Sequence, residues 1–272
     1  MIKEMLQEQN THEVGLLQSC KLIFGITFRQ SMRSKKTIFI LLLTLLPAVL
    51  AVFYRIFQSR TPMTPQNALM AIMMFYLQFI SVLVALFYAT ALVADEIDNK
   101  TITYLFTRPI RKYSIILGKF AAYVVEVLLI MVPPILITFV IVVANSGISG
   151  DLSPVLNTFF KRLGVIILGL ITYGAIFTYC GVRWRRPVLI GLVFAFGWEK
   201  VVLVVPGALR KFSVVYYLMS AFPGVGMPRM SIPRQLFPSI SANLSIIVLI
   251  AITFAFIILS IFSFQRREYK TE

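Results

Sequence analysis

The sequence is poor in the residues that build most catalytic and metal sites. Its 272 residues include one histidine, His12, and two cysteines, Cys20 and Cys180. One histidine excludes a multi-histidine metal site. The cysteines fall in a predicted cytoplasmic segment and in an apolar run, where a disulfide is not expected. Phosphate-loop, G-x-S-x-G and H-E-x-x-H patterns are absent. The sequence therefore predicts no catalytic residue, no metal site and no nucleotide site or cofactor of its own.

Acidic residues are also scarce. The chain has 11 Asp and Glu against 26 Lys and Arg, a formal charge of +15. In a soluble protein this excess would indicate nucleic acid as a partner. Here 58% of the residues are hydrophobic and the mean hydropathy is +0.86, well beyond a soluble domain. Basic residues collect in the cytoplasmic loops of membrane proteins because they resist translocation. We therefore expect the lipid bilayer, and no nucleic acid, as the surroundings of this chain.

Long apolar runs set the predicted architecture. A helix needs about 20 apolar residues to cross a bilayer, and these runs are continuous rather than alternating, which argues against a strand barrel. We predict an all-α polytopic membrane protein, with a kink at Pro133-Pro134. Its single transmembrane domain covers 1–272. The six predicted spans are 37–57, 68–94, 115–144, 163–182, 187–205 and 243–264.

The basic residues predict the orientation. Of the 26 Lys and Arg, 17 fall at or beyond the span ends on one side of the membrane and 8 on the other, while Lys200 lies within a span. The side richer in Lys and Arg is cytoplasmic, which places both termini in the cytoplasm. The first apolar run follows a polar leader, so we expect a retained span rather than a cleaved signal peptide. The predicted location is the plasma membrane, with multiple spans.

Two connections outside the spans have a pattern of their own. In the cytoplasmic segment 1–36, apolar residues recur at helical spacing and basic residues lie off that stripe, which predicts a helix in the headgroup plane; the alternative is a soluble amphipathic tail. The extracellular connection 206–242 is rich in proline, and its apolar run 212–222 is too short to span. We expect short helices there, with Tyr216 and Tyr217 at the membrane interface. The amphipathic stripe comprises Leu16, Leu17, Cys20, Ile23, Phe24 and Phe28, flanked by Lys21, Arg29 and Arg33.

A charged segment, 95–119, separates the second and third spans. Asp95 and Glu96 suit the start of a helix, where the helix dipole favours negative charge. Ile102, Leu105 and Phe106 follow at i, i+3 and i+4 and form one apolar face, and the proline after Arg108 predicts the end of the helix. An apolar face on a cytoplasmic loop needs a cover. It can be the N-terminal helix, the bilayer surface or a groove on a partner protein; an ordinary solvated turn is the alternative.

The same segment resembles a known family. VADE at 93–96, KTI at 100–102, LFTRPI at 105–110 and ILGK at 116–119 are similar to the permeases of type-2 ATP-binding-cassette (ABC) exporters. The resemblance implies a cytoplasmic coupling helix in the loop 95–114 that docks on a separate ABC ATPase subunit. It also implies a second permease copy or paralogue, and ATP and Mg bound only by the ATPase. The residues it assigns to coupling are Asp95, Glu96, Thr101, Ile102, Leu105, Phe106, Thr107, Arg108 and Pro109.

Three ionisable residues fall inside predicted spans. A charge at the centre of a membrane helix costs about 2.5–3.5 kcal/mol on insertion scales. Glu126 lies well inside the third span, and Glu199 and Lys200 lie past the middle of the fifth. All three are candidates for the translocation pathway. The alternative is a buried hydrogen-bonded group or, for Lys200, a side chain that extends to the interface.

Three functions are compatible with these features. The favoured one is the membrane subunit of an ATP-driven exporter that forms the translocation pathway and couples to a separate ATPase. The second is a stand-alone ion- or proton-coupled transporter or channel that uses Glu126 and Glu199. The third is a membrane scaffold or immunity protein without transport. Only the first gives the patterned loop a purpose.

Overall fold

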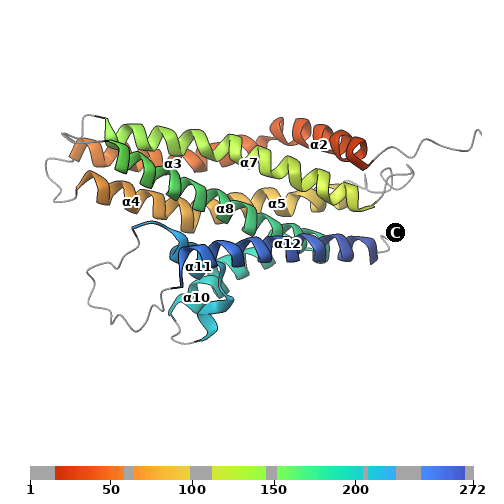
Figure 1. Cartoon of the computed structure of the whole chain (residues 1–272). Helices are drawn as coiled ribbons and strands as arrows, with labels where there is room; N and C mark the ends of the chain where they lie inside the picture. The colour runs from red at the N-terminus through yellow and green to blue at the C-terminus, as the bar shows by residue number, and fades with distance from the viewer. Residues whose placement is uncertain are drawn as a thin grey trace, which may run out of the picture.

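The computed structural model describes residues 16–57, 64–98, 112–144, 152–204, 208–224 and 240–266, and all of their regular elements are helical. Figure 1 shows the long helices running side by side in one bundle. η2 and η3 are π-helical turns and η4 is a 3₁₀ turn. In chain order the elements are α2 (Leu16–Met32), α3 (Lys35–Phe57), α4 (Pro65–Phe75), η2 (Tyr76–Ile80), α5 (Ser81–Asp98), α7 (Lys112–Val143), α8 (Ser153–Arg183), α9 (Pro187–Leu192), η3 (Val193–Trp198), α10 (Glu199–Val204), η4 (Ala208–Phe212), α11 (Val214–Ala221) and α12 (Ala242–Arg266).

Five helices in the described residues are long and apolar enough to cross a membrane. This confirms the prediction of an all-α polytopic membrane protein, and the five correspond to the first, second, third, fourth and sixth predicted spans. The predicted fifth span matches the helical run of α9, η3 and α10, which is not among the five, so the number six stays a prediction. The five helices are Lys35–Phe57, Pro65–Leu92, Tyr113–Val143, Ser153–Arg183 and Ala242–Arg266.

Helix α8 lies at the centre of the bundle. In its most apolar window 78% of the residues are buried, against 28% for α3 and 22% for α12. Its main neighbours are α5 and α12. At Gly181 the backbone of α5 comes so close that an added Cβ would lie 2.9 Å from the Thr90 carbonyl oxygen. Small residues permit such close helix packing within membranes, where apolar burial does not drive association.

Several predicted boundaries are wrong by a few residues or more. The predicted loop 95–114 is shorter, because α5 continues to Asp98 and α7 starts at Lys112. α8 starts ten residues before the predicted span 163–182, so Lys161 and Arg162 lie inside a helix rather than in a loop. α3 starts at Lys35, inside the segment 1–36 predicted to precede it. α7 contains both Pro133 and Pro134 and remains one helix.

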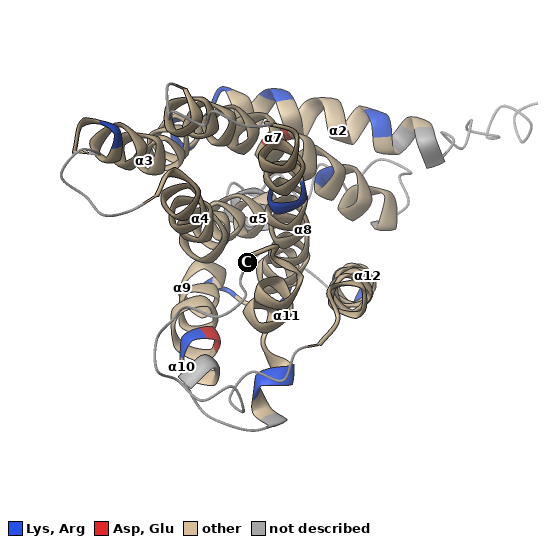
Figure 2. Cartoon of the chain, turned by 60° about the vertical axis from the view of Figure 1, so that its left-hand side comes forward, with Lys and Arg blue, Asp and Glu red and all other residues tan. Residues whose placement is uncertain are grey.

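The N-terminal helix predicted from the apolar stripe is present as α2. Its inward side carries Ile23, which is buried, while Lys21 and Arg29 are exposed. Figure 2 shows α2 along its length in a view where α12 is seen end on, so α2 crosses the direction of the bundle. A helix in this orientation is compatible with the membrane surface, and that location stays a prediction.

Candidate functional site

The segment that the sequence assigns to coupling begins near the end of α5 and leads to the start of α7. Asp95 and Glu96 belong to the last turns of α5. The remaining predicted coupling residues lie outside the described residues, so their role stays a prediction. They are Thr101, Ile102, Leu105, Phe106, Thr107, Arg108 and Pro109.

The two helix ends are fastened to each other by a buried lysine. The Lys119 ammonium donates a hydrogen bond of 2.5 Å to the Leu92 carbonyl oxygen near the end of α5. Lys119 is only 3% exposed. A hydrogen bond from a charged donor contributes about 1.5–3 kcal/mol. The end of α5 and the start of α7, between which the 99–111 connection runs in the sequence, are therefore joined to each other.

Helix α2 is fastened to the same place. A Cβ on Gly118 of α7 would lie 2.9 Å from the Cys20 carbonyl oxygen and 3.1 Å from the Ile23 Cβ. Only glycine permits this backbone approach. Next to it, the Cys20 thiol donates a hydrogen bond of 3.5 Å to the Ser114 carbonyl oxygen. The predicted coupling segment therefore starts from a three-helix junction of α2, α5 and α7.

Glu126 lies further along α7 and is fully buried. Among the described residues, neither carboxyl oxygen has a hydrogen-bond partner. The polar side chains that act on it are Ser31 of α2, which approaches the carboxyl group without meeting the geometry of a hydrogen bond, and Tyr88 of α5. An unsatisfied buried polar group costs about 1–3 kcal/mol. Glu126 therefore does not contribute to stability in this arrangement, and its place in the translocation pathway stays a prediction.

Glu199 has a different environment. Its carboxylate accepts hydrogen bonds from the Ser213 hydroxyl, at 2.5 Å, and from the backbone N–H groups of Val214 and Val215, at 3.0 and 3.1 Å. These donors form the N-terminal end of α11, where unpaired N–H groups and the helix dipole favour a negative charge. Glu199 therefore caps α11 from α10. This structural role accounts for its burial, whereas a role of Glu199 or Lys200 in the translocation pathway stays a prediction.

Arg162 of α8 holds the other end of α11. Its Nε donates to the Pro223 carbonyl oxygen at 3.0 Å, and its guanidinium lies 5.5 Å from the centre of the Phe222 ring. Gly224 follows with a positive φ of 86°. Figure 2 shows α9, α10 and α11 on the same side of the bundle. Glu199 and Arg162, which we call the α11 clamp, thus fix this short helix with opposite charges at the ends that its dipole favours.

Comparison with known proteins identifies the family. The sequence model described as ABC-2 family transporter protein matches residues 28–198, well over half of the chain. The chain belongs to the ABC-2 family of transporters. No curated protein matches it. An ABC-2 permease is a membrane transport component that generally lacks its own ATPase site. The matched residues include the contact of α5 with α7 and Glu126, but not Cys20 and Ile23 of α2, and they end directly before Glu199.

Sequence reasoning missed several polar contacts of this ABC-2 protein. Arg162 was counted as a loop charge. The hydroxyl of Tyr76 bridges the Thr44 carbonyl oxygen and the Thr138 hydroxyl, each at 3.1 Å, in the interior of the bundle. Hydroxyls inside apolar runs were visible in the sequence, but their partners are 32 and 62 residues away. Tyr216 and Tyr217 were expected at the membrane interface, yet they are 5% and 9% exposed because α11 is buried.

Proposed function

We propose that this chain is the membrane-spanning subunit of an ATP-driven ABC exporter, in which it forms the translocation pathway and couples to a separate ATPase. Membership of the ABC-2 family carries the proposal. The proposed subunit has six spans, the fifth formed by α9, η3 and α10. Both termini and the 99–111 connection lie in the cytoplasm of a cell whose plasma membrane holds the protein.

The proposed coupling is mechanical. A cytoplasmic ABC ATPase binds ATP and Mg, closes, and moves the segment between α5 and α7 on which it docks. Because Lys119 joins α7 to α5 and Gly118 lies against α2, the movement reaches all three helices together. A shift between two access states needs two packings of similar energy. A second permease copy or paralogue completes the pathway.

A stand-alone ion- or proton-coupled transporter is the second candidate. The observation that favours it is the burial of Glu126 without a hydrogen-bond partner among the described residues, since ionisable groups inside membranes often mark ion pathways. The two candidates differ in their energy source. Flux that follows a proton gradient in vesicles without any ATPase would support the second.

The coupling segment gives the sharpest test of the first candidate. Burial of one large apolar side chain contributes roughly 1.5–3 kcal/mol. Leu105→Asp removes that contribution and introduces a charge, so ATPase binding should weaken at least tenfold, at about 1.4 kcal/mol per decade. The measurements are copurification of the ATPase and ATP-dependent flux. Membrane insertion should not change, because Leu105 lies outside every predicted span.

Tyr104→Asp is the matched control. In the predicted coupling helix, position 104 falls on the side opposite Ile102, Leu105 and Phe106, so the same charge there should leave docking within about twofold. Unchanged copurification and unchanged flux for Leu105→Asp would show that the segment is not the coupling element. Equal losses in both variants would show that any added charge disturbs the loop.

A further inference from the structure

A cavity with both polar and apolar lining residues lies at the elbow between α2 and α3. Its volume is about 120 Å³, far more than the roughly 10–15 Å³ that one water requires. It is enclosed by the end of α2, the start of α3, and parts of α5 and α7. Of the residues that line it, the coupling mechanism uses only Lys119 and its acceptor Leu92, and the α11 clamp uses none. Its polar lining includes Ser31, Ser34, Lys36, Thr37, Tyr88 and Lys119.

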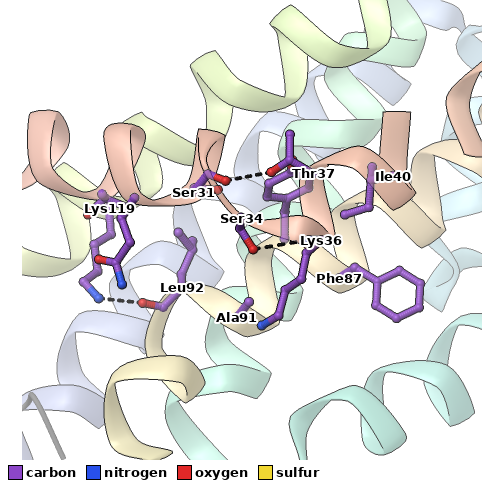
Figure 3. A pocket seen from close by; sticks show the side chains of 12 residues that line it. Ser31, Ser34, Lys36, Thr37, Ile40, Phe87, Ala91, Leu92 and Lys119 are labelled. Carbon is purple, nitrogen blue, oxygen red and sulfur yellow. Dashed lines mark hydrogen bonds between the residues drawn. The ribbon is translucent and has the colours of Figure 1, made fainter. Parts of the chain in front are cut away.

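The hydroxyl groups of the elbow are held by hydrogen bonds to the backbone and to one another. Thr37 donates to the Ser31 carbonyl oxygen at 2.7 Å, and the Tyr88 hydroxyl donates to Thr37 at 3.0 Å. The Ser34 hydroxyl accepts the Lys36 backbone N–H at 3.3 Å. Figure 3 shows two of these contacts on one wall of the cavity. The polar lining is therefore ordered before any ligand arrives, which reduces the cost of binding.

The cavity is suited to an anion. Lys36 and Lys119 reach it from different helices, with Ala91 and Leu92 of α5 between them in Figure 3. The 23-residue helix α3 starts here, and its N-terminal end adds positive potential. Among the described residues that line the cavity, none is acidic. Two ammonium groups, a helix start and the Ser34 hydroxyl, which accepts a hydrogen bond and keeps its own proton to donate, are groups that suit phosphate.

Apolar surface adjoins this polar lining. Phe87, which lines the cavity, packs edge-on against Phe39, with ring centres 6.4 Å apart. Phe39 is 60% exposed, and Ile38 and Leu42 on the same helix are 63% and 64% exposed. Phosphate-binding groups therefore lie next to a surface that suits acyl chains. A free phosphate ion would use only the first of these features.

We infer that the elbow cavity binds the phosphate of an anionic phospholipid of the cytoplasmic leaflet, with the acyl chains along the exposed face of α3. The inference uses the proposed orientation but not the proposed ATPase partner. Basic pockets between membrane helices on the cytoplasmic side are suited to lipid headgroups. A lipid bound here would brace the turn between α2 and α3, beside the junction with α7.

Glu126 provides an internal check. It does not line the cavity, but it acts on Ser31 and Tyr88, which do. An ionised carboxylate behind the wall would oppose an anion and favour a cation, whereas a neutral carboxyl would do neither. Glu126→Gln should therefore leave phospholipid binding unchanged or strengthen it. Weaker binding in this variant would overturn the assignment to an anion.

The test uses the purified full chain in detergent and measures binding of radiolabelled dioleoylphosphatidylglycerol. Lys36→Gln should weaken binding about fivefold, from roughly 1 kcal/mol per lysine at 1.4 kcal/mol per decade. Lys35→Gln is the matched control, because Lys35 is exposed and adjacent but does not line the cavity. It should change binding less than twofold. Lys119→Arg keeps the charge and should retain binding, whereas Lys119→Gln should weaken it; Lys36→Gln decides the question if Lys119→Gln does not fold.

Two unlabelled competitors distinguish the sources of the phosphate. Excess dioleoylglycerol, which has the same chains without phosphate, should not displace the labelled lipid, and millimolar inorganic phosphate should displace little of it. Displacement by dioleoylglycerol would show an apolar site only. Full displacement by inorganic phosphate would assign the cavity to a soluble anion and overturn the lipid. Equal losses of phospholipid binding in Lys35→Gln and Lys36→Gln would show a general effect of surface charge and would overturn the cavity as the binding site.

Discussion

Glu199 and Glu126 are both fully buried acids, yet their surroundings give them different roles. Glu199 accepts three hydrogen bonds from the start of α11. Glu126 has no hydrogen-bond partner among the described residues. A buried acid with partners stabilises the fold, whereas one without partners reduces stability. The two side chains should therefore respond in opposite ways to replacement by an uncharged residue.

Replacement of Glu199 should destabilise the protein. Glu199→Ala leaves Ser213, Val214 and Val215 without their acceptor, and hydrogen bonds to charged groups contribute about 1.5–3 kcal/mol. We expect a loss of that size in the free energy of unfolding, measured by thermal or denaturant unfolding in detergent. Lys200→Gln, one residue on, is the control and should change stability by less than about 0.5 kcal/mol. Equal stability of Glu199→Ala and the wild type would contradict the capping role.

Replacement of Glu126 should do the reverse. Glu126→Leu removes an unsatisfied buried polar group and should raise the free energy of unfolding by about 1–3 kcal/mol. Transport should fall in the same variant if the carboxyl serves the pathway, and Glu126→Gln should alter flux or its pH response more than expression. Flux in reconstituted vesicles and unfolding in detergent give the two quantities. A destabilised Glu126→Leu would identify a structural group with a partner outside the described residues.

At the scale of elements, the junction of α2 with α7 depends on Gly118. A Cβ there would lie 2.9 Å from a backbone oxygen, which cannot move aside as a side chain can. Gly118→Ala should therefore cost about 1–3 kcal/mol, as overpacking does, and should increase hydrogen exchange along α2. Gly164→Ala is the matched control, since nothing lies within 4 Å of its Cβ position. There the better helix propensity of alanine should add roughly 0.5–1 kcal/mol. Unaltered exchange of α2 in Gly118→Ala would refute the close contact.

The elements also show what sequence alone could and could not reveal. Apolar run length located five helices because hydropathy reflects the bilayer directly. It missed the first ten residues of α8, because Lys161 and Arg162 looked like loop charges. Arg162 can lie inside the helix because it donates to the Pro223 carbonyl oxygen and packs over the Phe222 ring, both about 60 residues away in the sequence. Such partners depend on tertiary structure and leave no local signal.

The same limit applies to the candidate site. The segment 95–109 was identified from its own residues and from resemblance, since its charges and apolar face are local. Glu126 and Glu199 were equivalent in the sequence, and only the position of α11 separates them. The elbow cavity combines Lys36 with Lys119, which are far apart in the chain. Its parts were visible, but their assembly required the fold.

For the whole molecule, orientation in the membrane connects every proposal. The 17-to-8 distribution of basic residues predicts that the elbow, the 99–111 connection and both termini lie in the cytoplasm. The end of α5, the start of α7 and the start of α3 then lie on one side, and the start of α8 lies on the other. An ATPase and cytoplasmic-leaflet lipids can reach their proposed sites only in this orientation.

Cysteine labelling in cells tests that orientation. In a background with Cys20→Ala and Cys180→Ala, Leu152→Cys introduces a thiol at a 53% exposed position before α8, and Arg33→Cys introduces one at an exposed position at the end of α2. A membrane-impermeant maleimide should label Leu152→Cys in intact cells and Arg33→Cys only after permeabilisation. The reverse pattern would show the opposite orientation, in which a cytoplasmic ATPase could not contact the 99–111 connection. Labelling of both positions in intact cells would contradict the predicted topology, because three spans, an odd number, separate Arg33 from Leu152.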